Sequence, residues 1–449
     1  MGAFAEESLL NSPRNIIGLK VEGQESVFTE EETNRAHEFK TGQEKDFVLF
    51  LMSILSRVFK TRVIVNSENF AWLPVSQEHR TLDLKPDLLL LHAAFYRIHR
   101  GTSSGRDASD TKRCGSPADE SLFPFTIVFE AKIPDNKNKL PTDGNFGEAI
   151  KYGVYMRRDK LGRDEFGKTP ARVLLVTPSE FWLIEIGMNE QVLSRTIWKW
   201  DLPGSLPALQ TFCSTDDLGL DKICALANVQ IADPYIFKSI DSAYLGTGGT
   251  GRAFAVLQSQ TGQDPSKLRK KDLHALKVVK VENLAYLQFE LAILKDHFNA
   301  CKCDAIVAPT SEIILSETHA AFTMQPVGRA VTIQDLIDNP TLVKDAFEAL
   351  RRLHTHNPPI YHSDPRLPNL LIFERKLVWI DLRQSEFLNW TRTSKFHFTV
   401  DVNILMKSIL SREELTGSLL TLAQGYDASE EASNQIGQAV SQELQRRLV

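Results

Sequence analysis

The most constraining part of this sequence is residues 360–371, together with a short stretch that follows them. An apolar run leads into the pattern His-x-Asp-x-Arg-x-x-Asn, which occupies residues 362–369. The hydrophobic residues 377–380 then predict a strand that ends at Asp381. Any one of these polar residues fits an ordinary surface loop between two buried strands. Their joint order and spacing are much less expected by chance, and they predict a catalytic loop.

The side chains of this loop are those that phosphoryl transfer uses. Asp364 can orient an attacking hydroxyl group, and Arg366 places a cation two residues further along the chain. Asn369 and Asp381 offer oxygen atoms, which are the hard ligands that Mg²⁺ prefers. The stretch therefore predicts a site that transfers a phosphoryl group from ATP.

Glycine and lysine motifs precede the loop in the order that an ATP site requires. Gly246, Gly248 and Gly251 form Gly-x-Gly-x-x-Gly between two expected strands, where glycines let backbone amides approach phosphate oxygens. Lys277 lies in the strand pattern of residues 274–279 and is expected to hold the α- and β-phosphates. A glycine-rich loop alone is weak support, but here a suitably placed lysine follows it.

Two further positions complete this predicted site. Glu290 lies in the helical run of residues 287–294 and is the expected ion-pair partner of Lys277. Residues 325–328 follow a strand pattern and predict a hinge, at which the backbone near Val327 would bind the adenine of ATP.

This series of motifs resembles that of protein kinases. The resemblance implies a bilobal α+β protein-kinase-like domain over residues 235–449, with ATP and Mg²⁺ as cofactors. It also implies that Asp364 is the catalytic base and that Arg366 steadies the transferred phosphate. Asn369 and Asp381 would bind Mg²⁺, and the phosphoacceptor would be a protein or a small molecule.

Some residues depart from the kinase pattern. Asp381-Leu382-Arg383 replaces Asp-Phe-Gly, and Ser363 replaces the arginine that receives an activation-loop phosphate in regulated kinases. No Ala-Pro-Glu occurs between Asp381 and Asp401, and Asp401 is expected to anchor the loop backbone from the next helix. These departures are also found in small-molecule kinases of the aminoglycoside type, and a pseudokinase is a further alternative.

The N-terminal half predicts a separate α/β domain over residues 35–200. A polar lead-in over residues 1–34 precedes it, and a connection containing proline and glycine follows over residues 201–234. Apolar spacings of three and four predict a helix within residues 35–59. A second helix is predicted over residues 145–158, and strands over residues 62–65, 84–92, 125–133, 172–177 and 181–186.

Two acids and a lysine in this half predict a second site. Asp87 opens one strand, and Glu130 and Lys132 lie on one side of another. Two carboxylates can hold Mg²⁺, which activates a bound water, while a lysine orients or deprotonates that water. The alternative is structural, because Pro-Asp before a strand is common and a Glu-x-Lys pair is usually solvated.

The pattern Pro86-Asp87 … Glu130-x-Lys132 resembles that of the PD-(D/E)xK nuclease superfamily. The resemblance implies a restriction-endonuclease-like α/β domain that cuts or binds DNA, with Mg²⁺ held by Asp87 and Glu130. Glu148 and Tyr152 occupy the positions of a Gln-x-x-x-Tyr signature, with glutamate in place of glutamine. Glu38 or Glu44 would supply the additional acid that members of the superfamily often carry.

The order of the two domains resembles that of Crinkler-type effectors, which implies action in the nucleus of a target cell. The Leu-Phe-Leu-Ala-Lys header of that family is absent, so secretion and host delivery are not expected. Two classes of function stay open. Either the chain is a phosphotransferase with a DNA-cleaving or DNA-binding domain, or both domains are inactive and serve as interaction and DNA-binding modules.

Composition limits the remaining possibilities. The 449 residues are 42% hydrophobic and 24% charged, as in an ordinary globular protein. The net charge of −5 means that any nucleic-acid site must be a local patch. No apolar stretch approaches the roughly 20 residues that span a bilayer, and no secretory signal is recognised. With five scattered cysteines, we expect an intracellular protein of the cytoplasm or nucleus without a membrane anchor.

Overall fold

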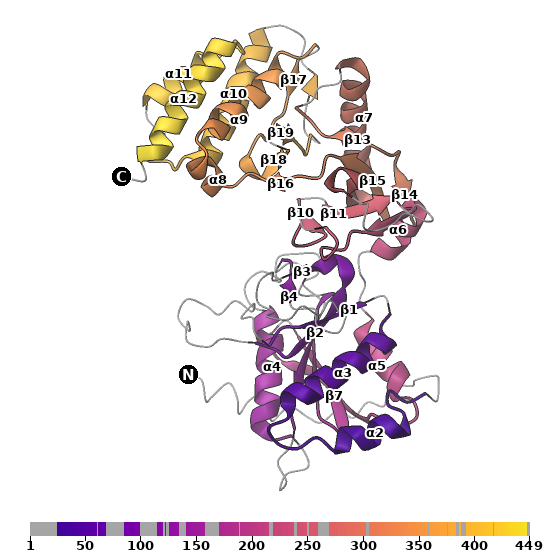
Figure 1. Ribbon diagram of the computed structural model, residues 1–449. Helices are drawn as coiled ribbons and strands as arrows, with labels where there is room; N and C mark the ends of the chain where they lie inside the picture. Colours follow the sequence, from indigo (N-terminus) through magenta and orange to yellow (C-terminus); the bar gives the residue numbers. More distant parts are fainter. Residues whose placement is uncertain are drawn as a thin grey trace. The chain divides into compact units, whose positions relative to one another are not determined.

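The computed structural model describes the chain from residue 25 to residue 446, with gaps. The described residues are 25–60, 62–68, 85–98, 115–119, 122, 125–133, 141–157, 170–187, 189–214, 219–237, 240–248, 251–258, 269–301, 305–357, 359–374, 376–382, 386–387, 392–415 and 417–446. They form mixed α/β structure in two compact units (Figure 1). The N-terminal unit comprises residues 1–218 and 233–244, and the C-terminal unit comprises residues 219–232 and 245–449.

A six-stranded sheet with the order β1-β2-β5-β6-β7-β8 lies at the centre of the N-terminal unit. Its strands are β1 (Arg62–Asn66), β2 (Leu88–His92), β5 (Ile127–Ala131), β6 (Ala171–Val176), β7 (Glu180–Ile186) and β8 (Val192–Lys199). Strands β5 and β6 are parallel, whereas the other neighbours are antiparallel. Parallel neighbours need a crossover connection, and helix α4 (Asp143–Arg157) lies in it. A short hairpin of β3 (Tyr96–Ile98) and β4 (Gly115–Pro117) is separate.

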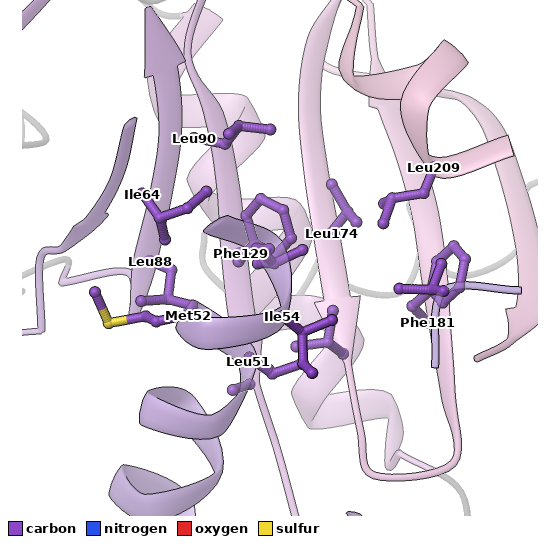
Figure 2. Packing of buried hydrophobic residues seen from close by; sticks show 14 of the residues in the cluster. Leu51, Met52, Ile54, Ile64, Leu88, Leu90, Phe129, Leu174, Phe181 and Leu209 are labelled. Atoms are coloured by element: carbon purple, nitrogen blue, oxygen red, sulfur yellow. The ribbon is translucent and has the colours of Figure 1, made fainter. Parts of the chain in front are cut away.

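Hydrophobic side chains on one face of this sheet pack against helix α3 (Glu44–Val58). Figure 2 shows Leu51 and Ile54 of α3 beside Phe129 of β5 within this core. Because side chains alternate along a strand, Glu130 lies on the opposite face. Helix α4 packs on that opposite face, where Gly153 permits close approach to Ile186 of β7 and to Val173 of β6.

The start of the chain differs from the sequence prediction. A loosely packed lead-in is predicted over residues 1–34, whereas Val27 and Phe28 are buried and Phe28 stacks on Trp200, with 4.5 Å between ring centres. One helix is predicted within residues 35–59, but the chain forms α2 (Glu30–His37) and then α3. Gly42 lies between them with a φ of +91°, a conformation that a continuous helix excludes.

The predicted connection over residues 201–234 is instead part of both units. Helix α5 (Ser205–Cys213) contributes Leu209 and Phe212 to the N-terminal core. Helix α6 (Leu220–Ala227) and strand β9 (Val229–Ile231) belong to the C-terminal unit, where β9 pairs with β11. The chain then returns to the N-terminal unit, in which the Ile98 amide donates to the Asp241 carbonyl at 2.8 Å.

A seven-stranded sheet organises the first part of the C-terminal unit, and β9, β11, β12, β13, β14 and β15 pair in it in the antiparallel sense. Its main path is β10-β11-β12-β15-β13, with β9 paired to β11 and β14 paired to β15. The additional strands are β10 (Tyr244–Thr247), β11 (Gly251–Gln258), β12 (Leu273–Lys280), β13 (Ala308–Pro309), β14 (Ile314–Leu315) and β15 (His319–Gln325). Helix α7 (Leu284–Cys301) packs against β12, β13 and β15.

The second part of this unit is mainly helical. Its helices are α8 (Ile333–Asp338), α9 (Thr341–His354), α10 (Arg392–Ile409), α11 (Gly417–Gln424) and α12 (Glu430–Arg446). Two small sheets accompany them, β16 (Arg329–Ala330) with β18 (Leu370–Phe373) and β19 (Lys376–Trp379), and β17 (Ile360–Tyr361) with β20 (Glu386–Phe387). The predicted catalytic loop connects β17 to β18. None of the helices described above has the length and apolar character needed to cross a bilayer.

Candidate functional site

A buried lysine connects the sheet of the C-terminal unit to two other segments. Lys277 lies in the middle of β12, between Ala253 of β11 and Phe322 of β15. Its Nζ lies 2.6 Å from Oε2 of Glu290 on α7 and 3.0 Å from Oδ1 of Asp381, which follows β19. The structure therefore brings together three residues that the sequence predicted for one site.

The environment of Lys277 favours its charged form. Burial by itself disfavours an ammonium ion, but the carboxylates of Glu290 and Asp381 more than offset this and raise the pKa of Lys277. The side chain of Lys277 is only 13% exposed. An ammonium held in this way presents a fixed positive charge, which is what binding of a phosphate group requires.

The loop between β17 and β18 gathers the other predicted residues around Asp364. Nε and Nη2 of Arg366 donate to Oδ1 and Oδ2 of Asp364 at 2.5 and 2.7 Å. Nδ2 of Asn369 donates to the Asp364 carbonyl at 2.9 Å and to its Oδ2 at 3.1 Å. The carboxylate of Asp364 is therefore oriented from both sides. Arg366 contacts Asp364 directly, whereas the sequence predicted contact with a phosphate.

The two predicted magnesium ligands lie on adjacent segments. The amide of Ile380 donates to the carbonyl of Asn369 at 2.9 Å, which places Asp381 next to the loop. Asp381 has a φ of +64°, and its side chain reaches Lys277. An amide and a carboxylate oxygen fit a hard cation. The described residues contain no group of three or more His, Cys, Asp or Glu side chains that could hold a metal. Arg383 lies outside the described residues.

A carboxylate from α10 holds the start of the loop. Oδ2 of Asp401 accepts from the His362 amide at 2.8 Å, and Oδ1 accepts from the Ser363 amide at 2.9 Å. Ser363 has a φ of +70°, which is a strained conformation for a residue other than glycine. The imidazole of His362 packs edge-on against Trp379, and burial lowers the pKa of His362. The contact expected of Asp401 is present, and it fixes the backbone immediately before Asp364.

The glycine-rich stretch lies between β10 and β11. The Gly248 amide donates to the Gly251 carbonyl at 2.8 Å. Gly246 has a φ of +144°, and a Cβ at Gly251 would clash with the backbone of Val278. A Cβ at Gly248 would meet nothing closer than 3.9 Å, so packing within the protein does not require glycine there. Val327, the predicted hinge residue, is buried two residues after the end of β15.

In the N-terminal unit, three predicted residues lie together where two inner strands of the sheet begin or end. They are Asp87, before β2, and Glu130 and Lys132, at the end of β5. Asp87 directly precedes β2, and its Oδ2 accepts from the Ala131 amide of β5 at 2.7 Å. Nζ of Lys132 lies 2.6 Å from Oε1 of Glu130 and 3.2 Å from Oε2 of Glu148 on α4. The structure thus brings the predicted set together, and it places Glu148, the residue at the first position of the expected signature, against Lys132.

Both acids have an increased proton affinity. Burial raises the pKa of Asp87 to about 7, although the Ala131 amide and the charge of Lys132 act in the opposite direction. Burial and the neighbouring charge of Asp87 raise the pKa of Glu130 to about 8. Oε2 of Glu130 is buried and has no hydrogen-bond partner among the described residues. Two close carboxylates with one unused oxygen form a donor set that suits a divalent cation.

Other side chains around these acids clarify which predictions hold. Tyr152 of α4 lies near Glu130, and burial together with the charges of the nearby acids raises the pKa of Tyr152. The charges of Glu68 and Glu44 both act on Asp87. Glu38, the alternative to Glu44 as the additional acid of the site, is the residue that caps the C-terminal end of α2. Sequence reasoning missed Glu68, although its position directly after β1, the neighbour of β2, is a usable signal.

The comparisons with known proteins add no relative. A scan of the chain against models of protein families found no match, and a search of the curated proteins found none either. We therefore interpret the two sites from their own geometry.

Proposed function

We propose that the C-terminal unit is an ATP-dependent phosphotransferase of the protein-kinase type. The observation that carries this proposal is the position of Lys277, whose Nζ contacts both Glu290 and Asp381. One contact reaches a helix and the other reaches the segment next to the loop that contains Asp364 and Asn369. An ordinary structural ion pair does not require five polar side chains from separate parts of the chain. The five are Lys277, Glu290, Asp364, Asn369 and Asp381.

Each of these residues has a role in the proposed reaction. Lys277 binds phosphate oxygens, and the glycine-rich stretch of Gly246, Gly248 and Gly251 places backbone amides close to them. Backbone groups at Val327 hold the adenine. Asn369 and Asp381 would hold Mg²⁺, which would neutralise charge on the phosphoryl group that ATP supplies.

Asp364 acts on the acceptor in this scheme. Its carboxylate accepts the proton of the attacking hydroxyl group, and its hydrogen bond from Asn369 fixes the direction of its free lone pairs. Arg366 keeps Asp364 oriented before the acceptor arrives, and its guanidinium would supply positive charge beside the transferred group.

The proposal is tested by incubation with Mg²⁺ and ATP labelled at the γ-phosphate. We expect incorporation by the wild type and a loss of at least about 100-fold in Asp364→Asn, which changes charge with little change in shape. Arg446→Gln, which removes an exposed ion pair with Glu443, is the matched control and should retain activity. ATP binding without any transfer, to protein or to small hydroxyl compounds, would favour the pseudokinase alternative. Transfer to small compounds alone would favour an aminoglycoside-type kinase.

For the N-terminal unit we propose Mg²⁺-dependent cleavage of a phosphodiester in DNA. Support comes from the paired carboxylates of Asp87 and Glu130 and from the unused oxygen of Glu130. These two residues would hold Mg²⁺, which would stabilise charge on the scissile phosphate. Lys132, fixed between Glu130 and Glu148, would orient the attacking water.

Cleavage of supercoiled plasmid tests this second site. Nicking should need Mg²⁺, should be lost in Glu130→Gln, and should persist in Asp364→Asn, which alters only the C-terminal unit. Equal nicking by the wild type and Glu130→Gln would indicate a contaminating nuclease. DNA binding without cleavage would favour a DNA-binding module. With both activities present, the order of the units would support a place among Crinkler-type proteins.

A further inference from the structure

Three buried polar side chains form a connected chain behind the loop that contains Asp364. They are Asp401 of α10, His354 at the end of α9, and Tyr426, which lies between α11 and α12. His354 and Asp401 are fully buried, and Tyr426 is 1% exposed. Nε2 of His354 lies 3.1 Å from Oδ2 of Asp401, and Nδ1 of His354 lies 3.2 Å from the hydroxyl of Tyr426.

The chemistry of the three groups gives the chain a direction. Oδ2 of Asp401 is an acceptor, so Nε2 of His354 donates to it. In a neutral imidazole the other nitrogen is then an acceptor, and the Tyr426 hydroxyl donates to Nδ1. Burial raises the pKa of Tyr426, which keeps the proton on this hydroxyl. The hydrogen bonds therefore run in one direction: Tyr426 donates to His354, and His354 donates to Asp401.

The same oxygen of Asp401 also holds the loop. Oδ2 accepts from both His354 and the His362 amide, while Oδ1 accepts from the Ser363 amide. The hydrogen bonds from the His362 and Ser363 amides to Asp401 hold the strained backbone of Ser363, and Asp364 is the next residue. A rotation of the Asp401 carboxylate would therefore shift the group that receives the acceptor's proton.

Tyr426 is the member that fixes the rotation of the imidazole. Phe398 stacks on His354 with 4.2 Å between ring centres, and this contact sets the plane of the ring. Stacking does not select which nitrogen faces Asp401, because the ring is apolar on both faces. The hydroxyl of Tyr426 makes that selection by bonding to Nδ1.

We propose that Tyr426 is a positioning residue for Asp364, acting through His354 and Asp401. The C-terminal helices thus contribute to catalysis without touching the substrate. This inference rests on the phosphotransferase function proposed above, so its test needs one measurement of activity and one that does not depend on activity.

The first variant is Tyr426→Phe, which removes one oxygen atom. We expect kcat to fall about tenfold and KM for ATP to stay unchanged, because Lys277 and the glycine-rich stretch are not affected. Hydrogen–deuterium exchange should become faster in peptides that contain the amides of His362 and Ser363. Val440→Ala is the control, because it weakens the core of α12 and Val440 has no polar side chain to join the chain. At equal loss of melting temperature it should change neither kcat nor this exchange.

A second variant keeps the test decisive if Tyr426→Phe folds poorly. His354→Phe removes the nitrogen that accepts from the Tyr426 hydroxyl, and by itself it should also lower kcat and speed the same exchange. Tyr426→Phe added to it should have no further effect on kcat or exchange. Additive effects of the two substitutions would overturn the proposal. Unchanged exchange in Tyr426→Phe would overturn it as well. If the wild type transfers no phosphate, the proposed function fails, but faster exchange in Tyr426→Phe would still support the positioning role.

Discussion

Nζ of Lys277 lies 3.0 Å from Oδ1 of Asp381, although the two residues come from distant parts of the chain. Lys277 belongs to β12, and Asp381 belongs to the segment after β19. The contact connects the seven-stranded sheet to the region of the loop that contains Asp364. Because Glu290 binds the same ammonium, one cation balances two carboxylates that are largely withdrawn from water. The stability of this site, and the phosphotransfer proposed for it, should therefore depend on one side chain.

Replacement of this lysine should separate the two effects. In Lys277→Met, Glu290 and Asp381 stay buried without their cation, so the C-terminal unit should lose about 3–5 kcal/mol of unfolding free energy. Adding Glu290→Gln should restore much of the stability but none of the phosphotransfer. Denaturant unfolding and labelled-phosphate transfer measure the two properties. Recovery of transfer in the double variant would exclude a role for Lys277 in ATP binding.

The raised pKa of Glu130 predicts a pH-dependent stability of the N-terminal unit. The folded state holds the proton up to about pH 8, whereas an unfolded glutamate releases it near its ordinary value of 4.5. The contribution of Glu130 to the free energy of unfolding is therefore greatest below pH 4.5, and it falls as the pH rises toward 8. Glu130→Gln should flatten this decline and add about 1–2 kcal/mol at pH 8. Hydrogen exchange of β5 against pH provides the measurement. An equal slope in both proteins would contradict the assignment.

Cation binding at Asp87 and Glu130 should release protons. Ligand carboxylates must be ionised, and the pKa values of about 7 and about 8 mean that part of the population is protonated at neutral pH. The affinity for Mg²⁺ should therefore rise between pH 6 and pH 8.5. Calorimetry in buffers of different ionisation enthalpy would detect the released protons. Asp87→Asn should abolish binding, whereas Lys45→Gln, at an exposed ion pair nearby, should not.

Periodicity and motif order locate most elements around the two sites. Strands β1, β2, β5, β6 and β7 and helix α4 lie within a few residues of their predicted positions, because each is strongly apolar on at least one face. Strand β8 escapes prediction since it is an edge strand whose Leu193 and Ile197 are about half exposed. Helix α5 was not predicted, because Pro203, Gly204 and Pro207 are residues typical of a connection between domains.

The candidate site residues divide in a similar way. Lys277, Asp364 and Asn369 can be predicted because their chemistry depends on a fixed local spacing. Tyr426 cannot, because its role arises from contacts between distant segments, and Glu68 offers only its position shortly after β1 as a signal. The bidentate pair of Arg366 with Asp364 is also invisible in the sequence, which identifies a cation but not the group that it contacts.

The left-handed backbone of Ser363 predicts opposite effects of two substitutions. Glycine adopts a φ of +70° without strain, and the buried Ser363 hydroxyl has no hydrogen-bond partner among the described residues. Ser363→Gly should therefore keep or raise stability by up to about 1 kcal/mol. Ser363→Val adds a β-branched side chain and should cost more than about 1 kcal/mol. Thermal unfolding measures both, and equal melting temperatures would show that Asp401 imposes no strained conformation.

The boundary of the C-terminal unit gives a last prediction. A fragment that begins at residue 235 lacks β9, which pairs with β11 through Ile231 and Val256, and lacks α6, which packs against β14 and β15. Loss of this strand leaves the buried edge of β11 without hydrogen-bond partners and exposes apolar side chains such as Val256. A fragment of residues 219–449 should therefore unfold cooperatively, whereas residues 235–449 should aggregate or melt at a lower temperature. Light scattering and calorimetry distinguish the two, and equal behaviour would mean that β9 and α6 contribute little to the fold.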